Sequence, residues 1–358
     1  MISTSVLRKH LITILASSMA VDCILWNLEA PNRLGFALLE QQYMAFQLGL
    51  ALTSTYLKSN FRGEESATID WFHGTVAAAI FAILMYAAID FVWLLKEQAY
   101  RPWQITLIGA VVTLSVVEGI RRRTGWMLFG IVVIFMIYSL FADKVPGQLI
   151  GKALTIERMV QYIGLYPNAV FSTPLAVGTF IVMLFVFFGN LLFAAGGGSF
   201  FTDLAMAATG RSRGGSAKIS VVGSALFGSI SGSAVSNVVT TGVVTIPLMQ
   251  RGGDSKRDAG AIEAVASTGG QLTPPIMGAA AFLMAEFLDI SYFTVAGAAL
   301  IPAALYYLSV FTQVDLIAGR DNIQPADAET MTVRQVLQEG WHFIIPFAVL
   351  LIARKRVV

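Results

Sequence analysis

The apolar stretch Ile219–Met249 constrains the fold most, because it is too long for one membrane crossing and has Lys218 and Arg251 just outside its ends. As one straight helix it would measure roughly 46 Å at about 1.5 Å per residue, against a hydrocarbon core of about 30 Å. Its Gly/Ser-rich centre, Ser229–Asn237, allows the chain to fold back on itself. We therefore expect a re-entrant hairpin of two short helices, with both basic ends on one membrane face.

A second unusual stretch follows at Ala259–Leu288, which is long enough to span a bilayer but is interrupted in the middle. The interruption, Ser267–Pro275, contains two glycines followed by two prolines. Irregular backbone at membrane depth persists only where protein or a water-filled cavity satisfies its hydrogen bonds. Two such breaks close together in the sequence predict a binding site near the middle of the membrane.

Composition places the whole chain in the class of polytopic membrane proteins. Of 358 residues, 56% are hydrophobic and only 13% are charged, and the mean hydropathy is +0.70, whereas a soluble domain carries about 25% charged residues. The basic residues lie in loops between apolar segments, so the net charge of +2 does not indicate nucleic-acid binding. The single cysteine, Cys23, rules out an intrachain disulfide, and three scattered histidines form no metal-site pattern. We expect an all-α fold without a resident cofactor.

Apolar segments recur along the chain, and the charges between them set the topology. We expect membrane helices at Leu11–Leu28, Gln41–Leu57, Phe72–Leu95, Trp103–Glu118, Gly125–Phe141, Thr173–Ala194 and Tyr292–Phe311. Placing the Arg121–Arg123 turn in the cytoplasm fixes the side of every other loop by alternation. The positive-inside rule then holds only if Ile219–Met249 enters and leaves through the same face. The basic residues before this stretch are expected to anchor the hairpin at the cytoplasmic surface.

The segment Ala142–Asn168 divides the chain, because its apolar residues are spaced as in an amphipathic helix along the membrane interface. We predict an N-terminal membrane region at 1–165 and a transport domain at 166–358. The final apolar segment, Trp341–Ala353, is short for a span and is followed by three basic residues. From this ending we expect the chain to be a truncated form of a longer protein.

The centre of the hairpin offers oxygen ligands without permanent charge. Hydroxyl and amide groups gather where the arms meet, at Ser231, Ser233, Ser236 and Asn237. Together with freed backbone carbonyls, they can replace the water around Na⁺. Helix termini add partial charges, since carbonyl ends favour cations and amide ends favour anions.

The broken helix has matching start and stop signals. Gly269 and Gly270 can end its first half, and Thr273 can N-cap a second half whose first residue is Pro274. Discontinuous helices whose ends face a central cavity are a recurring solution for ion-coupled transport.

Simpler interpretations exist for several of these residues. Small residues such as Gly228 and Gly232, four apart, are also typical of ordinary helix–helix packing in membranes. The acids in apolar stretches are Asp22, Asp90, Glu118, Glu263 and Glu286. Asp90 and Glu286 lie near predicted helix ends, and Glu118 can pair with the arginines one turn away. These positions explain the three acids without a functional role. Asp22 and Glu263 remain candidates for a proton relay.

The chain resembles the large, DctM-like permease subunit of TRAP transporters, and within these the fused permeases of the TAXI subgroup. The resemblance rests on FFTDLAMAATGRSRGGSAK, ALFGSISGSAVSNVVTTGVVTIPLM and EAVASTGGQLTPPIMGAAAFLMAEFL. It is specific from about Phe171 to Val314. The segment RRRTGWMLFGIVVIFMIYSLF is similar to the small-permease-like part of such fusions.

This resemblance implies a transporter rather than an enzyme. The implied fold is of the elevator type, with two inverted repeats that each contain a re-entrant hairpin and a broken helix. The implied activity is cation-coupled import, usually with Na⁺, of an organic anion such as a carboxylate. A periplasmic TAXI-type solute-binding protein would deliver the anion to the multi-pass permease in the bacterial inner membrane.

The resemblance also assigns roles to residues of the two breaks. The implied ion site comprises Ser231, Ser233, Ser236, Asn237, Gly269, Gly270, Leu272 and Pro274, the last four through the broken helix. The implied substrate contacts are Ser233, Asn237, Thr240, Thr268, Gln271 and Thr273.

In one respect the chain departs from the family pattern, since a second repeat with its own hairpin and break is not found in it. A disrupted reading frame, a gene fragment or a split subunit would each explain this, and we expect the protein not to transport unless a complementary half is supplied, for example by a separate chain. The alternative is a truncated, non-transporting membrane fragment or scaffold. An intramembrane enzyme is disfavoured, because no paired acids, metal cluster or activated nucleophile stands out.

Overall fold

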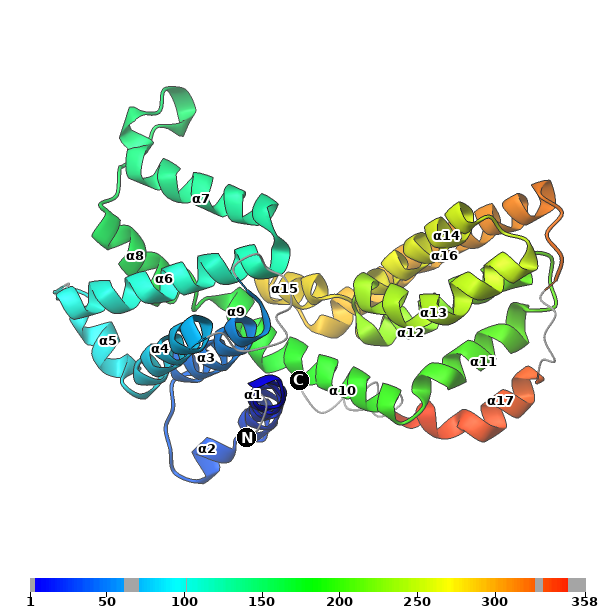
Figure 1. The fold of residues 1–358 in the computed structure, drawn as a ribbon, viewed down its shortest axis with the longest axis horizontal. Coiled ribbons are helices and arrows are strands. Elements are labelled where there is room, and N and C mark those ends of the chain that lie inside the picture. The colour runs from blue at the N-terminus through cyan, green and yellow to red at the C-terminus, as the bar shows by residue number, and fades with distance from the viewer. Residues whose placement is uncertain (1–3, 61–70, 101, 326–330, 347–358) are drawn as a thin grey trace. The chain divides into compact units, whose positions relative to one another are not determined.

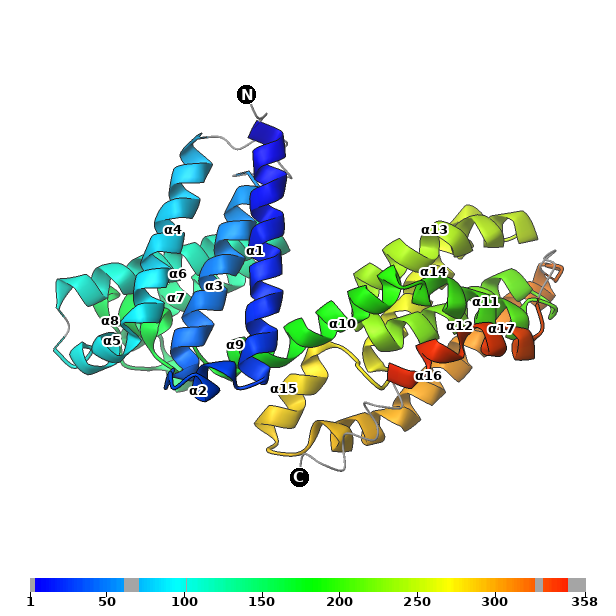
Figure 2. The same cartoon turned by 90° about the horizontal axis from the view of Figure 1, so that it is seen from below.

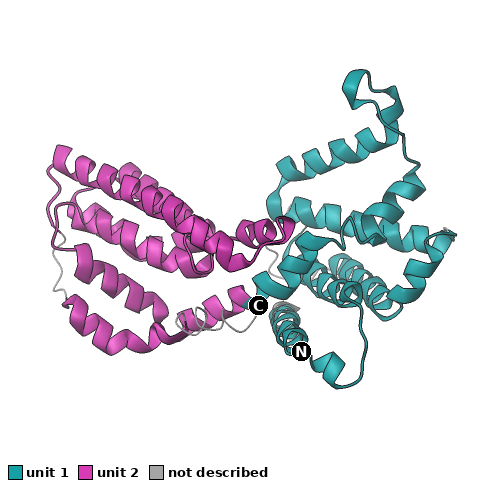
Figure 3. Cartoon of the chain, turned by 180° about the vertical axis from the view of Figure 1, so that it is seen from behind, with its two compact units in different colours: residues 1–184 teal, residues 185–358 magenta. Residues whose placement is uncertain are grey.

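The computed structural model describes residues 4–60, 71–100, 102–325 and 331–346. Its regular secondary structure in these ranges is helical. The chain divides into two compact units, residues 1–184 and 185–358 (Figure 3). This confirms the expected all-α class, and the two units are described separately below.

Unit 1 is built around three helices that lie side by side, α1, α3 and α4 (Figure 2). Its elements are α1 Thr4–Asn27, α2 Ala30–Arg33, α3 Glu40–Lys58, α4 Trp71–Ile89, α5 Phe91–Glu97, α6 Trp103–Thr124, α7 Trp126–Phe141, the short 3₁₀ turns η1 Ala142–Lys144 and η2 Gly147–Leu149, α8 Ile156–Leu165, α9 Thr173–Val177 and the π-helical η3 Gly178–Val182. Buried apolar side chains from α3 to α6 form its core, including Met44, Leu84, Phe91 and Ile105.

Unit 2 contains both sequence breaks. Its elements are α10 Met183–Ala194, α11 Gly197–Thr209, α12 Gly215–Ser231, α13 Ala234–Gly252, α14 Lys256–Gly269, η4 Gly270–Leu272, α15 Ala279–Phe287, α16 Tyr292–Arg320, α17 Val333–Gly340 and η5 Trp341–Phe343. Helices α12, α13 and α14 pack against one another (Figure 1). A cluster of buried apolar residues, among them Val221, Met249, Ile262 and Val314, joins α12, α13, α14 and α16.

Six helical segments in the described ranges have the length and apolar composition that a bilayer crossing requires. They are Val6–Asn27, Trp71–Ile89, Trp103–Thr124, Trp126–Lys144, Thr173–Ala194 and Tyr292–Arg320. These match six of the seven expected membrane helices, which supports a multi-pass membrane protein. The seventh expected membrane helix, Gln41–Leu57, is present as α3, but it is not among the six segments with this length and apolar composition.

Two expected helices differ from their predicted bounds. The segment expected at Phe72–Leu95 is divided at Asp90 into α4 and α5, and the expected amphipathic helix is confined to α8. Helix α8 packs on α6 through Gly164, where an added Cβ would lie 2.3 Å from the carbonyl oxygen of Gly109. The two compact units divide the chain after residue 184, and the predicted domain boundary after residue 165 stays a prediction. Of the expected final segment Trp341–Ala353, residues 347–353 lie outside the described residues.

Candidate functional site

Helices α12 and α13 form the expected helical hairpin. Helix α12 ends at Ser231, and its C-cap Gly232 has a φ of +59°, the left-handed conformation that glycine adopts most easily. Helix α13 starts directly afterwards, and the Ser233 hydroxyl caps it by accepting a hydrogen bond from the N–H of Ser236 at 3.3 Å. Two adjacent local signals therefore turn the chain, and the membrane face on which the arms end stays a prediction.

The broken helix is present, but its second half begins later than predicted. Helix α14 ends at Gly269 as expected, whereas α15 begins at Ala279 with Gly278 as its N-cap, so the predicted start at Thr273 and Pro274 is wrong. A residue before a proline is disfavoured in the helical conformation, and Pro274 is followed by another proline. The Thr273 hydroxyl instead donates a hydrogen bond of 2.9 Å to the carbonyl oxygen of Gly269.

Several backbone groups of the break are hydrogen-bonded within the protein, as membrane depth would require. The N–H of Ile276 donates to the carbonyl oxygen of Ser229 in the hairpin at 3.0 Å, and that of Gly278 donates to Gln271 at 2.9 Å. Tyrosine hydroxyls of α16 bind further carbonyl oxygens: Tyr292 to Pro275 at 2.9 Å, Tyr306 to Val265 at 2.7 Å and Tyr307 to Ala266 at 2.9 Å.

The hairpin lies in direct backbone contact with the break. A Cβ added to Gly228 would lie 2.4 Å from the Cα of Gly270, and one added to Gly232 would lie 2.1 Å from the carbonyl oxygen of Met277. The packing interpretation of Gly228 and Gly232 is thus confirmed. It coexists with a cavity formed on the other side of the hairpin.

This cavity has a volume of about 340 Å³ and lies between α10 and the hairpin tip. Its apolar wall comprises Val186, Phe193, Phe227 and Ile230, with Gly189. Its polar groups come from Asn190, Ser231, Ser233, Ser236 and Thr240. Four of these five residues were predicted from the sequence to bind ion or substrate. Asn190 was missed, and its signal was an amide inside an otherwise apolar helix.

The hydroxyl of Ser231 stands out within this cavity. It is the one hydroxyl oxygen in the described ranges that is buried and has no hydrogen-bond partner. A buried polar atom without a partner is costly, so an unpaired hydroxyl in a cavity wall indicates a ligand position. The C-terminal end of α12 and the N-terminal end of α13 also meet here, which offers partial charges of both signs.

The other predicted site residues lie elsewhere around the tip. Asn237 is fully buried and faces away from the cavity, donating to the carbonyl oxygens of Ser224 at 2.9 Å and Ser267 at 3.3 Å. Gly269 and Gly270 are buried at the end of α14. Thr268, Gln271 and Leu272 are exposed, and Thr273 and Pro274 are half-buried. None of these borders the cavity, so their predicted roles remain proposals.

Ion pairs hold the base of the hairpin to α16. The carboxylate of Asp315 accepts from the ammonium group of Lys218 and from the guanidinium group of Arg213, each at 2.6 Å. The basic residues before the hairpin therefore anchor it to a neighbouring helix of unit 2.

Asp254, in the loop between α13 and α14, gives a pH-dependent prediction. Burial raises the pKa of its carboxyl, and the negative charges of Asp258 and Asp321 act in the same direction. An acid whose pKa is raised by folding stabilises the protein at low pH, and this contribution is lost as the pH rises from the ordinary carboxyl range through the raised value. D254N should therefore raise the Tm of the detergent-solubilised protein by about 2 °C at pH 7.5, with the gain shrinking as the pH falls toward 4. A D254N protein less stable than its parent at pH 7.5 would contradict this account.

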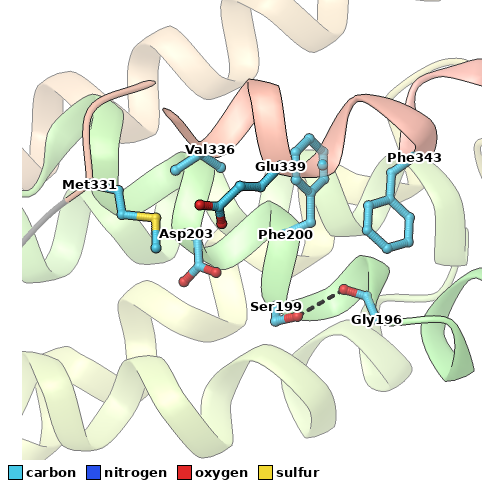
Figure 4. Close-up of a pocket in the computed structure, with 9 residues that line it drawn as sticks. Gly196, Ser199, Phe200, Asp203, Met331, Val336, Glu339 and Phe343 are labelled. Carbon is cyan, nitrogen blue, oxygen red and sulfur yellow. Dashed lines mark hydrogen bonds between the residues drawn. The ribbon is translucent and has the colours of Figure 1, made fainter. Parts of the chain in front are cut away.

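A second cavity of unit 2, of about 150 Å³, lies between α11 and α17 and was not predicted. Figure 4 shows the carboxylates of Asp203 and Glu339 on facing sides of it, with Ser199 donating to the carbonyl oxygen of Gly196 at 2.8 Å. Partial burial and the charge of Glu339 raise the pKa of the Asp203 carboxyl. None of the predicted ion or substrate residues lines this cavity.

Two of the acids in apolar segments, Glu118 and Asp22, have side-chain partners in unit 1. Glu118 binds Arg121 at 2.6 Å and Arg122 at 2.8 Å, which confirms the local pairing expected for it. Asp22 accepts a hydrogen bond of 3.0 Å from Gln47. Across the described part of the chain, no group of three or more His, Cys, Asp and Glu residues is arranged to hold a metal ion.

Comparison with known proteins assigns most of this chain to a family. The sequence model of the family described as "Tripartite ATP-independent periplasmic transporter, DctM component" matches residues 111–355, more than half of the chain. A protein of Salmonella typhimurium with the name "Uncharacterized protein YgiK" is 30% identical over 184 residues. That match spans 49% of this chain and 41% of the relative's length. The matched family consists of transport components and not of enzymes. With the hairpin, the break and the membrane-length helices, this match shows that the chain belongs to the DctM family of TRAP transporter components.

Proposed function

We propose that this chain is a permease component of a TRAP-type secondary transporter of the bacterial inner membrane. It imports an organic anion, such as a carboxylate, that a periplasmic solute-binding protein of the TAXI type delivers. Residues 1–165 include a small-permease-like region, and residues 166–358 supply one hairpin and one broken helix of an elevator-type transport domain. Na⁺ is the coupling ion.

The observation that carries this proposal is the hydroxyl-lined cavity at the hairpin tip, with the unpaired Ser231 hydroxyl in its wall. Its polar groups are neutral oxygens and one amide, and oxygen ligands suit hard cations such as Na⁺. An uncharged wall also leaves the α13 amide end free to favour an anion. Cation and anion can therefore bind close together at the hairpin tip.

Uptake by cells tests the proposal on the protein as it exists. In its native host, deletion of the gene should abolish Na⁺-dependent accumulation of at least one member of a panel of radiolabelled mono- and dicarboxylates. A plasmid copy should restore it. Replacement of Na⁺ by choline should remove uptake, whereas a protonophore at constant Na⁺ should not. Uptake that deletion leaves unchanged across the panel would favour the non-transporting scaffold, and uptake abolished only by the protonophore would favour H⁺ coupling.

The Ser231 hydroxyl gives a sharper prediction, because removal of a group with no partner in the protein should not weaken folding. We expect S231A to keep or slightly raise the Tm without Na⁺, and to weaken the apparent Na⁺ affinity about tenfold through loss of one ligand. The measurement is the rise in Tm of the purified protein with increasing NaCl at constant ionic strength. S229A is the matched control, since the Ser229 hydroxyl donates to Leu226 at 2.7 Å and does not line the cavity. Equal Na⁺ affinities of S231A and the parent would count against Ser231 as a ligand.

A further inference from the structure

The carboxylate of Glu263 lies at the centre of unit 2 and is fully buried. Five hydroxyl groups from three helices surround it. They are Ser220 at 2.6 Å and Ser224 at 3.3 Å in α12, Thr241 and Thr245 in α13, the latter at 2.5 Å, and Ser267 at 3.0 Å in α14. None of the ion pairs found in the described ranges includes Glu263. Hydrogen bonds from hydroxyl groups therefore take the place of a basic partner.

The spacing of these residues explains how three helices meet at one carboxylate. Each helix contributes a pair of residues four apart: Ser220 and Ser224, Thr241 and Thr245, and Glu263 and Ser267. Residues four apart lie on the same face of a helix. Gly242 lets α14 come close, because a Cβ there would lie 3.2 Å from the Cγ of Glu263.

Helix α13 therefore has two polar faces. Ser236 and Thr240 border the cavity, whereas the residues that follow each of them, Asn237 and Thr241, point into the hydroxyl cluster. Consecutive residues are rotated by about 100° around a helix. The rotation of α13 about its own axis thus decides which hydroxyls reach the cavity.

Apolar packing does little to fix that rotation. The buried residues of α13 are Asn237, Thr241, Gly242, Thr245 and Met249, only the last of which has a large apolar side chain. The valines of this helix are mostly exposed, with Val235 at 75%, Val239 at 65% and Val243 at 73%. Directional hydrogen bonds hold its buried face instead: Thr241 and Thr245 donate to Glu263, and the amide of Asn237 donates to the carbonyl oxygens of Ser224 and Ser267.

We propose that Glu263 is a positioning residue for the hairpin site: its carboxylate fixes the rotation of α13 and so keeps Ser236 and Thr240 in the cavity. This inference rests on the proposed function only in treating the cavity as the binding site. Glu263 itself contacts neither ion nor substrate in this role.

Cysteine labelling tests the rotation directly. Cys23 is the single cysteine, so C23A gives a background for single reporters at Thr240, on the cavity face, and at Val239, one residue away. In this background T240C should react at least about fivefold faster than V239C with a charged, water-soluble methanethiosulfonate reagent, because Thr240 borders the polar cavity whereas the exposed apolar face of Val239 is covered by lipid or detergent in a membrane protein. In T241V/T245V, which removes both bonds from α13 but leaves Ser220, Ser224 and Ser267 on the carboxylate, the ratio of the two rates should approach one.

S220A is the matched control, because it removes a bond of similar length from α12 without touching α13, and the ratio should stay at its background value. If T241V/T245V does not yield monodisperse protein, E263Q, which preserves the side-chain volume, carries the same test and should lower the ratio. A ratio near one in the background, an unchanged ratio in T241V/T245V and E263Q, or an equal fall in S220A would each overturn the inference. Failure of Na⁺-dependent uptake with the ratio shift intact would instead refute the proposed function alone.

Discussion

Replacing Gly232 with alanine is expected to destabilise unit 2 by on the order of 3 kcal/mol and to abolish uptake. Two effects add at this residue. Its φ of +59° costs an alanine about 1 kcal/mol or more, and the added Cβ would lie 2.1 Å from the carbonyl oxygen of Met277. That carbonyl cannot easily retreat, because the N–H groups of Ile276 and Gly278 on either side of it are hydrogen-bonded to Ser229 and Gln271.

G253A is the control for this prediction. Gly253 ends α13 with a φ of +108°, but an added Cβ there would meet nothing within 4 Å. The G253A variant therefore has the strained backbone conformation, but its added Cβ does not collide with another atom. The Tm of each purified variant, measured without and with Na⁺, separates the two effects. Equal losses in G232A and G253A would show that the contact between hairpin tip and break contributes little.

The second large effect is expected for G228A, at the crossing of the hairpin and the broken helix. An added Cβ would lie 2.4 Å from the Cα of Gly270, which is backbone and cannot turn away as a side chain can. Overpacking of this kind costs about 1–3 kcal/mol and should exceed the gain of up to about 1 kcal/mol in helix propensity. We expect a clear fall in Tm and a weaker response of the Tm to Na⁺, because α12 moves away from α14.

G223A, in the same helix, is the matched control. Its Cβ would lie 3.7 Å from the Cβ of Ala205, an ordinary contact distance, so it should be neutral or stabilising. If G228A were as stable as G223A, the two helices would have to separate at little cost. The close crossing would then not be a requirement of the fold.

Features that depend on local backbone properties were predictable from the sequence. Length and flanking charge indicated the fold-back between Lys218 and Arg251, and the glycines indicated its turn and the end of α14. The second half of the break begins later than the cap and proline signals at Thr273 and Pro274 predicted, because Pro275 disfavours the helical conformation at Pro274. The side of the membrane and the coupling ion remain proposals.

The residues that line the cavity were predicted in part, because helical residues that are neighbours in sequence can face different directions. Ser231, Ser233, Ser236 and Thr240 do share a cavity. Asn237 does not border it, although its amide lies one residue from Ser236. Asn190 was missed, since an isolated amide in an apolar helix indicates nothing about its partners until α10 is placed beside the hairpin.

The sequence by itself determined that this chain is a helical membrane protein with a folded-back hairpin and a broken helix. Apolar length, glycine and proline act through local backbone energetics, so they can be read without knowledge of distant contacts. Only the tertiary structure decided which face of α13 lines the cavity and what surrounds Glu263. Ser220 and Glu263 lie 43 residues apart, and their hydrogen bond exists only once α12 and α14 have packed together.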